Sequence, residues 1–361
     1  MSGTMTQPVM IMAGGTGGHV YPALAVADEL RNRGVPVVWL GTRKGIEARL
    51  VPEAGIEVDW LGISGLRGKS VLTLMLAPFN MFIACVQALR IMLRRKPCVV
   101  LGMGGFVSGP GGLMAWLLRK PLLIHEQNAI PGLTNRLLSR LANIVMQAFP
   151  DSFQVAAVHV GNPVRRAIAS LPSPEQRMRQ RQGPLRLLVF GGSLGAARLN
   201  EVVPLALSQL PEERRMDVWH QAGPKNIEQA RTNYSRLNVT ARVDAYIEDM
   251  ADAYSWADLV ICRAGAMTIA ELAAAGVASV LVPYPYAVDD HQSANAAYLS
   301  DADAALLIQQ DDLNENSLLQ ILLKLSREQL LDMATRARRL GMPESTQMVA
   351  QQCLAAGGVS C

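Results

Sequence analysis

The chain contains one local pattern twice: an apolar run, a glycine-rich turn, and then a segment with helical periodicity. Near the start, residues 9–13 lead into Gly14-Gly15-Thr16-Gly17-Gly18-His19. Halfway along, residues 187–190 lead into Gly191-Gly192-Ser193-Leu194-Gly195. A buried strand that enters a glycine turn and then a helix is the typical opening of a βαβ unit. The repetition therefore predicts two Rossmann-like lobes.

Length and composition agree with this organisation. A chain of 361 residues is longer than one hydrophobic core usually organises, and 50% hydrophobic with 18% charged residues fits parallel strands buried on both faces. We expect an α/β fold with two doubly wound lobes. Strands are predicted at 35–40, 99–101, 122–124 and 144–146, then at 216–220, 259–261 and 280–283, with helices at 23–33 and 196–209 and a surface connection at 170–184.

Several classes of protein are disfavoured by composition. The five cysteines are scattered and form no C-x-x-C pair, so neither a zinc site nor a disulfide framework is indicated. No basic residue precedes Arg31, which argues against a cleavable secretory signal. Residues 1–163 carry 15 Lys and Arg against 8 Asp and Glu, whereas the remainder carries 19 against 22. No basic run alternates with stacking aromatics, so an anionic membrane fits the basic half better than nucleic acid does.

Residues 71–89 contain no charged side chain and are flanked by basic residues on both sides. Their length would allow a membrane span, but Pro78, Asn80 and Gln87 interrupt them, and a span would cut the first βαβ series in two. A helical hairpin with an exposed apolar face is expected instead. It either packs in the core or docks on anionic lipid. The docking residues would be Leu76, Phe79 and Phe82 with Lys69, Arg90 and Arg94.

Glycine turns that open helices suit phosphate, because backbone N–H groups and the helix dipole face the anion, although glycine at such a turn often serves packing alone. A nicotinamide enzyme would need an acidic residue after the second strand, where this chain has Gly41-Thr42-Arg43. Arg43 could meet a 2′-phosphate, so an NADP-dependent enzyme stays an alternative.

The run Cys262-Arg263-Ala264-Gly265-Ala266-Met267-Thr268-Ile269-Ala270-Glu271 predicts a strand end, a glycine turn and a helix start. Backbone donors at residues 266–268 can hold a diphosphate, and Glu271 can accept both hydroxyls of a ribose. The competing interpretation of Glu271 is a solvated helix glutamate. Asp301-Ala302-Asp303 spells a D-x-D metal pattern, but it follows an alanine-rich helix and is interpreted as a surface turn.

Taken together, the motifs resemble those of glycosyltransferase family 28, whose members have the GT-B fold with a cleft between two Rossmann-like lobes. The resemblance spans most of the chain and rests on the first glycine turn, GMGGFVSGP at 102–110, HEQN at 125–128, GNPVR at 161–165, Gly191-Gly192-Ser193, the run from Arg263 to Glu271, and HQSANA at 291–296. It implies inverting transfer of N-acetylglucosamine from UDP-N-acetylglucosamine to the C4 hydroxyl of undecaprenyl-diphosphate-linked N-acetylmuramyl pentapeptide in peptidoglycan synthesis, and so a role in cell shape and division.

The resemblance also assigns site residues. Donor contacts fall on Thr16, Gly17, Gly18, Asn128, Arg165, Ser193, Ile247, Ala266, Met267, Thr268, Ile269, Ala270, Glu271 and Gln292. The acceptor diphosphate falls on Gly14, Gly15, Gly104 and Gly105. Phe106 stands where a tyrosine is common in the family. No cofactor and no metal ion are expected.

Domain roles follow from the same resemblance. Residues 1–163 would bind the acceptor and the membrane, residues 164–341 the UDP-sugar, and residues 342–361 would return to the first lobe. The expected location is the cytoplasmic face of the bacterial inner membrane, with other cell-wall synthesis proteins as further candidate partners.

An inverting transfer needs a base for the acceptor hydroxyl. His19 is the first candidate, because it ends a glycine turn and an imidazole titrates near neutral pH. Hydrogen bonding at the helix start or substrate positioning are alternative roles for it, and Glu126 and His125 are rivals for the base. A noncatalytic sugar-nucleotide sensor and a UDP-sugar epimerase are further alternatives for the whole protein.

Overall fold

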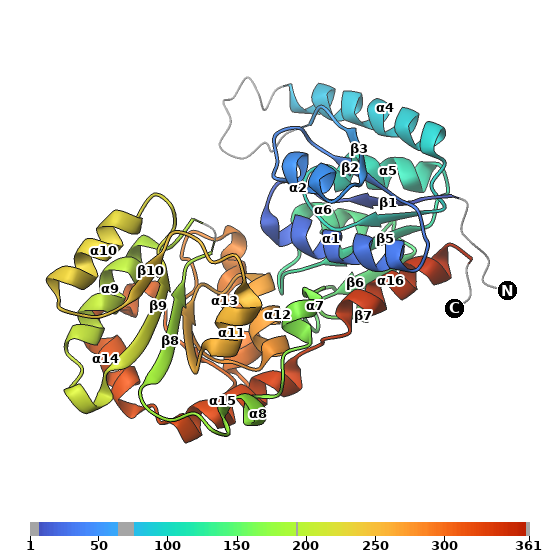
Figure 1. The fold of residues 1–361 in the computed structure, drawn as a ribbon. Coiled ribbons are helices and arrows are strands. Elements are labelled where there is room, and N and C mark those ends of the chain that lie inside the picture. Colours follow the sequence, from blue (N-terminus) through green and yellow to red (C-terminus); the bar gives the residue numbers. More distant parts are fainter. Residues whose placement is uncertain (1–6, 64–75, 193, 359–361) are drawn as a thin grey trace. The chain divides into compact units, whose positions relative to one another are not determined.

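The computed structural model describes residues 7–63, 76–192 and 194–358, which form two compact units. The first unit comprises the chain up to Val164 together with the segment from Glu344 onward. The second unit is Arg165–Pro343. Figure 1 shows that each unit is a parallel sheet with helices on both faces.

The first unit has a parallel sheet in the order β3-β2-β1-β4-β5-β6-β7. Its central strands are wholly buried, and their residues are apolar except for His125 and Glu126 at the end of one of them, as expected for a sheet covered on both faces. Its strands are β1 (Val9–Met12), β2 (Val37–Gly41), β3 (Glu57–Trp60), β4 (Val99–Gly102), β5 (Leu122–Glu126), β6 (Ile144–Gln147) and β7 (Val158–His159). Its helices are α1 (Gly17–Asn32), α2 (Glu47–Glu53), α4 (Ala77–Arg95), α5 (Ser108–Leu117), α6 (Leu133–Leu138) and α16 (Ser345–Ala356).

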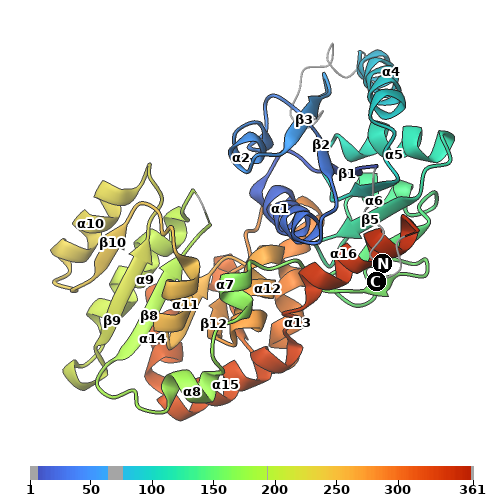
Figure 2. The same cartoon turned by 45° about the vertical axis from the view of Figure 1, so that its right-hand side comes forward.

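Alternation along β1 divides the first unit's core into two layers. Val9 and Ile11 pack with α1 and with Val349 and Leu354 of α16. Met10 and Met12 of β1 face the opposite layer, which contains buried residues of α4 and α5. The last helix of the chain therefore completes the core of the first unit, and Figures 1 and 2 show it beside α1.

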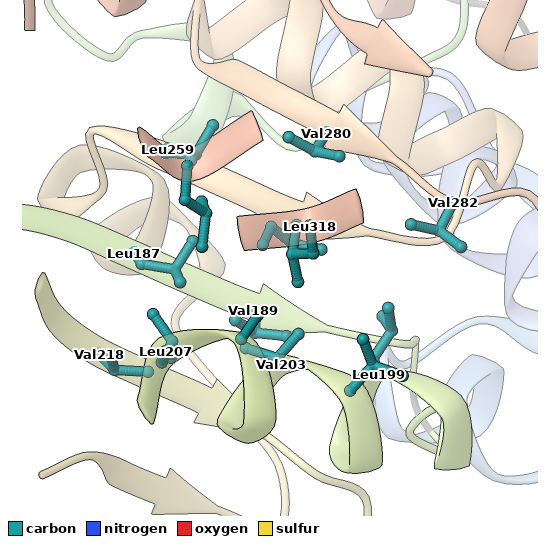
Figure 3. Packing of buried hydrophobic residues seen from close by; sticks show 14 of the residues in the cluster. Leu187, Val189, Leu199, Val203, Leu207, Val218, Leu259, Val280, Val282 and Leu318 are labelled. Atoms are coloured by element: carbon teal, nitrogen blue, oxygen red, sulfur yellow. The ribbon is translucent and has the colours of Figure 1, made fainter. Parts of the chain in front are cut away.

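The second unit has a parallel sheet in the order β10-β9-β8-β11-β12-β13. Figure 3 shows one face of it, where Leu187 and Val189 of β8 pack against Leu199, Val203 and Leu207 of α9. Its strands are β8 (Leu185–Phe190), β9 (Met216–Gln221), β10 (Arg242–Asp244), β11 (Leu259–Cys262), β12 (Ala278–Leu281) and β13 (Leu306–Leu307). Its helices are α7 (Arg166–Ala169), α8 (Pro174–Met178), α9 (Ala197–Ser208), α10 (Ile227–Arg236), α11 (Met250–Trp256), α12 (Ala266–Ala275), α13 (His291–Ser300), α14 (Glu315–Lys324) and α15 (Arg327–Leu340).

Three expectations from the sequence need correction. The first helix starts at Gly17 rather than at residue 23, because the last glycines of the turn adopt helical geometry. The strand expected at 280–283 is Ala278–Leu281. Residues 170–184 are more than a surface connection, since they include α8 and two tethered arginines: Arg177 donates to the carbonyls that end α12, and Arg181 pairs with the buried Asp258. The strands β3, β7, β10 and β13 were not predicted.

Topology brings the glycine turns together in each unit. In the first sheet β1 lies between β2 and β4, and in the second β8 lies between β9 and β11, so the strand order reverses at these pairs. Ligands of open parallel sheets bind at the carboxyl ends of the strands flanking such a reversal. The turns after β1 and β4 meet there in the first unit, and in the second unit those after β8 and β11 leave neighbouring strands at the same edge of the sheet.

Candidate functional site

The two glycine turns of the first unit are in direct contact. Gly104 and Gly105 both have positive φ, and a Cβ on Gly105 would collide with the backbone of Gly14. A Cβ on Gly104 would lie 2.6 Å from Nδ1 of His19. Glycine is therefore required at both positions for packing, and the four residues expected at an acceptor diphosphate, Gly14, Gly15, Gly104 and Gly105, do lie together.

The N-terminus of α1 is open to a ligand. Thr16 is its N-cap, but the threonine side chain makes no capping hydrogen bond, and the first turn holds no acidic residue. Gly17 and Gly18 form the first two helical positions, where backbone N–H groups have no partner within the helix. This arrangement suits an anion.

Glu47 is a functional candidate that the sequence did not reveal. It is fully buried, and its carboxylate accepts hydrogen bonds from the Gly15 backbone N–H at 2.9 Å, the Thr42 backbone N–H at 3.0 Å and the Thr42 hydroxyl at 2.7 Å. A Cβ on Gly14 would lie 2.5 Å from Oε1 of Glu47. The carboxylate thus fixes the glycine turn and uses the Gly15 N–H, which leaves the N–H groups of α1 as the open donors. A glycine turn beside an acidic helix start at Gly45-Ile46-Glu47 was the available signal.

His19 lies in the first turn of α1, half-buried, with Nδ1 3.0 Å from Oε1 of Gln127. Gln127 is buried, and its Nε2 donates to the Met103 carbonyl at 3.0 Å and lies 3.1 Å from Nδ1 of His125. His125 is fully buried with Nε2 2.9 Å from the Gly161 carbonyl, and burial lowers its pKa to about 4. His125 is therefore neutral at physiological pH and lies out of reach of solvent.

Glu126, the other expected catalytic residue, is 2% exposed. Its two carboxylate oxygens accept hydrogen bonds from the Asn128 backbone, the Asn128 side chain, the Gly132 backbone and the Asn135 side chain. A carboxylate with four donors holds the loop after β5 in place, and this geometry favours His19 over Glu126 as a base. Asn128, expected at the donor, is one of the groups that Glu126 orients.

The second unit holds a matching arrangement at α12. This helix begins after Gly265, has no side-chain cap and has no acidic residue in its first turn, so Met267 and Thr268 offer backbone N–H groups. Glu271 follows, with Oε1 3.3 Å from Nη2 of Arg165 and Oε2 accepting a hydrogen bond of 3.0 Å from the Tyr254 hydroxyl. The structure thus joins Arg165 and Glu271, and adds Tyr254, which the sequence analysis missed.

Electrostatics at Glu271 reflect both burial and its partners. Desolvation raises the pKa of the Glu271 carboxyl, while the Arg165 guanidinium and the hydrogen bond from Tyr254 oppose that shift. Burial and the neighbouring carboxylate raise the pKa of the Tyr254 hydroxyl well above its ordinary value, so the hydroxyl stays a donor. Arg165 is 45% exposed at its side chain, which leaves it available to a ligand anion.

The remaining donor residues border the same edge of the second sheet. Ile247 follows β10 and is a buried residue. Gln292, in the first turn of α13, accepts a hydrogen bond from the Tyr284 backbone N–H at 2.9 Å. Gln221 donates to the Gly192 carbonyl at 2.8 Å and so steadies the turn after β8. Ser193 lies outside the described residues, as does Lys69 of the expected membrane surface.

Helix α4 carries the apolar surface expected from residues 71–89, of which 71–75 lie outside the described residues. Ala84, Ala88 and Met92 are buried against the unit, while Leu76, Phe79 and Phe82 are 49%, 63% and 66% exposed. Within the described ranges no helix has the length and hydropathy to cross a membrane. The described part is a single helix rather than a hairpin.

The basic residues of α4 differ in their surroundings. Arg94 is tied to Asp59 of β3 by an ion pair, although most of its side chain is exposed. Arg90 is exposed and makes no ion pair among the described residues. Arg90 is therefore the freer cation of the two.

Asp301 and Asp303 lie in an exposed turn, where Asp303 pairs with Arg336 at 3.2 Å. In the described ranges, no group of three or more His, Cys, Asp or Glu side chains is arranged to hold a metal ion. The NADP alternative depended on Arg43. The Cζ atom of its guanidinium lies 5.4 Å from the centre of the Trp60 ring.

Two parallel Rossmann-like sheets, each with glycine turns at its strand-order reversal, define the GT-B class of glycosyltransferase fold. The chain belongs to glycosyltransferase family 28: the family's N-terminal domain matches residues 9–147 and its C-terminal domain residues 186–349. It is therefore a glycosyltransferase, and neither a nicotinamide-dependent oxidoreductase nor a noncatalytic sensor.

Similar proteins agree with the family. The UDP-N-acetylglucosamine--N-acetylmuramyl-(pentapeptide) pyrophosphoryl-undecaprenol N-acetylglucosamine transferase of Nitrosococcus oceani is 55% identical over 350 residues, covering 96% of this chain and 98% of that protein. The crystal structure of MurG from Acinetobacter baumannii has 44% sequence identity to this chain and a TM-score of 0.87, and the match covers 97% of this chain and 99% of that chain. A UDP-GlcNAc 2-epimerase from Neisseria meningitidis shares the fold alone. It is 13% identical with a TM-score of 0.67, and the match covers 97% of this chain and 100% of that chain.

Proposed function

We propose that this enzyme transfers N-acetylglucosamine from UDP-N-acetylglucosamine to the C4 hydroxyl of undecaprenyl-diphosphate-linked N-acetylmuramyl pentapeptide, with inversion at the anomeric carbon. Support comes from the activity named for the Nitrosococcus relative, which matches this chain over nearly its full length. The observation that carries the proposal is the constellation at α12: an uncapped helix start, a cation at Arg165 and a carboxylate at Glu271.

Each part of that constellation suits one part of a UDP-sugar. Backbone N–H groups at Met267 and Thr268 would bind the diphosphate, and the Arg165 guanidinium would offset its charge. The Glu271 carboxylate, oriented by Tyr254, would accept hydrogen bonds from the two ribose hydroxyls. The Arg165 to Glu271 contact is long at 3.3 Å, so a ligand can exchange for it without losing a strong bond.

The acceptor would bind the first unit, with its diphosphate at the open N-terminus of α1. His19 would then act as the base. Its Nε2 takes the proton of the C4 hydroxyl as that oxygen forms a bond to C1 of the sugar, and the C1–O bond to UDP breaks with its electron pair leaving on UDP. Negative charge on the departing UDP would be stabilised by the α12 N-terminus and by Arg165.

The reaction is tested by a product assay. The enzyme is incubated with the lipid acceptor and radiolabelled UDP-N-acetylglucosamine, and the butanol-extractable label is counted. Parallel reactions use labelled UDP-glucose or UDP-N-acetylgalactosamine as the donor. Label should pass into the lipid from UDP-N-acetylglucosamine in preference to the other sugars. Release of free sugar, epimerised donor, or label without lipid dependence would contradict the proposal.

The role of His19 is tested separately. His19→Ala should retain UDP binding, measured by calorimetry, but should lower kcat by about two or more powers of ten, since a general base contributes roughly that much. Near-normal turnover would reassign the base.

We also propose that α4 docks the enzyme on the cytoplasmic face of the inner membrane. Leu76, Phe79 and Phe82 form an exposed apolar face, and Arg90 is an exposed cation on the same helix. Apolar insertion combined with electrostatic attraction to anionic lipid is how interfacial helices bind. A membrane position would also bring the enzyme to an acceptor that is confined to the bilayer, beside any other cell-wall enzymes working there.

Flotation with phosphatidylglycerol vesicles tests the membrane role. The double variant Phe79→Asp with Phe82→Asp should abolish flotation at both low and high salt. Arg90→Glu should weaken flotation mainly at low salt, because salt screens the electrostatic attraction to lipid and leaves the apolar contact unchanged. A matched substitution, Asp303→Ala, lies in an exposed turn of the second unit and should leave flotation unchanged. Equal flotation of wild type and the double variant would overturn the assignment.

A further inference from the structure

The hydrogen-bond network behind His19 begins at two backbone carbonyls, which can only accept. Nε2 of His125 lies 2.9 Å from the Gly161 carbonyl, so it must carry a proton. His125 is fully buried and neutral, so its single ring proton is used there and its Nδ1 is left as an acceptor. That nitrogen needs a donor from its neighbour.

Gln127 supplies this donor, and its orientation follows. Its Nε2 lies 3.1 Å from Nδ1 of His125 and 3.0 Å from the Met103 carbonyl, two acceptors that match the two hydrogens of an amide nitrogen. The flipped amide would set an oxygen against the Met103 carbonyl and against an unprotonated imidazole nitrogen. Neither contact is stable when buried, so Oε1 of Gln127 must face His19.

The third step fixes the tautomer of His19. Oε1 of Gln127 lies 3.0 Å from Nδ1 of His19 and can only accept, so Nδ1 carries the proton of a neutral ring. Nε2 of His19 then holds the lone pair. Gly104 leaves room for this ring position, because any Cβ there would lie 2.6 Å from Nδ1.

We propose that Gln127 is a positioning residue, which holds His19 in the Nδ1–H tautomer so that its Nε2 is ready to take the acceptor's proton. This rests on the proposed function as far as proton transfer is concerned. The tautomer itself is a property of the folded chain. Gln127 stabilises the neutral base without placing a charge beside it, because an amide oxygen is an acceptor without net charge.

The experiment uses the full-length protein labelled with 15N at its five histidines. Protonated and bare imidazole nitrogens have well-separated 15N shifts, and the His19 signals are identified by their loss in His19→Gln. Spectra are recorded at about pH 9, where an ordinary imidazole is neutral. His19 should show a protonated Nδ1 and a bare Nε2.

Two variants separate positioning from mere structural support. Gln127→Met and Gln127→Glu both remove the amide hydrogens donated to Met103 and His125, but only the glutamate keeps an oxygen facing Nδ1 of His19. The Nδ1–H tautomer should persist in Gln127→Glu and be lost in Gln127→Met, with kcat of Gln127→Met reduced about ten- to hundredfold at nearly constant KM.

Each outcome decides the proposal. An Nε2–H tautomer in the wild type, an unchanged tautomer in Gln127→Met, or equal loss in both variants overturns it. If the wild type shows the expected tautomer but transfers no sugar to the lipid acceptor, the proposed reaction fails while the role of Gln127 in setting the tautomer stands.

Discussion

The buried carboxylate of Glu47 holds the first glycine turn, and Glu47→Gln would change one of its three hydrogen bonds. Oε1 accepts from the backbone N–H and the hydroxyl of Thr42, whereas Oε2 accepts from the Gly15 N–H at 2.9 Å. A glutamine can keep its oxygen on Thr42, but its amide nitrogen then faces the Gly15 N–H. Two donors would meet, and the bond that fixes the turn would be lost.

The size of the effect follows from that single contact. A hydrogen bond to a charged group contributes about 1.5–3 kcal/mol, and a donor left facing another donor cannot recover it. Local opening of the turn should become easier by the same amount, which corresponds to roughly ten- to hundredfold faster exchange of the Gly15 amide, since about 1.4 kcal/mol is tenfold. The acceptor's KM should rise because the adjacent N–H groups of α1 are less ordered.

Hydrogen exchange read by mass spectrometry on a peptide covering residues 13–18 measures this opening. Thr42→Val is the matched control, because it removes the hydroxyl bond to Oε1 and leaves the Gly15 bond intact. It should cost about 1.5–3 kcal/mol of unfolding free energy, as another hydrogen bond to the same carboxylate, but without faster exchange at Gly15. Unchanged exchange in Glu47→Gln, or equal acceleration in Thr42→Val, would refute the role given to Glu47.

Three further predictions follow from the contacts. Gly104→Ala should lower kcat by about a hundredfold, because its Cβ would displace His19 and its φ of +94° is strained for alanine. Tyr254→Phe should raise the donor's KM about three- to tenfold, since Glu271 loses the hydroxyl that orients it. Burial lowers the pKa of His220 to about 3, so the unfolded chain binds a proton that the folded chain excludes. The His220 contribution to stability should fall as pH drops below about 6.5, by about 2 kcal/mol at pH 5, and His220→Gln should lose that part of the slope, whereas the part that comes from buried His125 stays.

Gly132→Ala is the control for Gly104→Ala and should leave kcat unchanged, because an added Cβ at Gly132 would meet no atom within 4 Å. Normal turnover of Gly104→Ala would show that catalysis does not depend on the present position of the His19 ring. For Tyr254→Phe, a change in the acceptor's KM instead of the donor's would contradict the role of Glu271. An identical pH slope of urea unfolding in wild type and His220→Gln would contradict the linkage.

The sequence predicted the strands that are short apolar runs, because a strand buried on both faces of a sheet needs apolar side chains along its length. It missed β3, whose Glu57 and Asp59 pair with Arg95, and β13, which has two residues. Such strands form because of their contacts with neighbouring elements. Likewise the roles of Tyr254 and Glu47 were missed, since Tyr254 meets Glu271 17 residues away and Glu47 meets Gly15 32 residues away, and only the acidic helix start at Glu47 gave a local signal.

The sequence alone determined that this chain would build two glycine-turn α/β lobes, because residue type and spacing set local conformation. It also predicted His19 and Glu271 as site residues from their chemistry, and the family resemblance added Arg165. Only the tertiary structure decided which groups meet. Parallel pairing of β1 with β4 brings Gly104 against His19, and the loop after β5 turns Gln127 toward the same ring. A hydrogen bond between distant segments, from His19 to Gln127, selects the tautomer of His19. Glu126, in contrast, is saturated by donors two to nine residues further along its own loop.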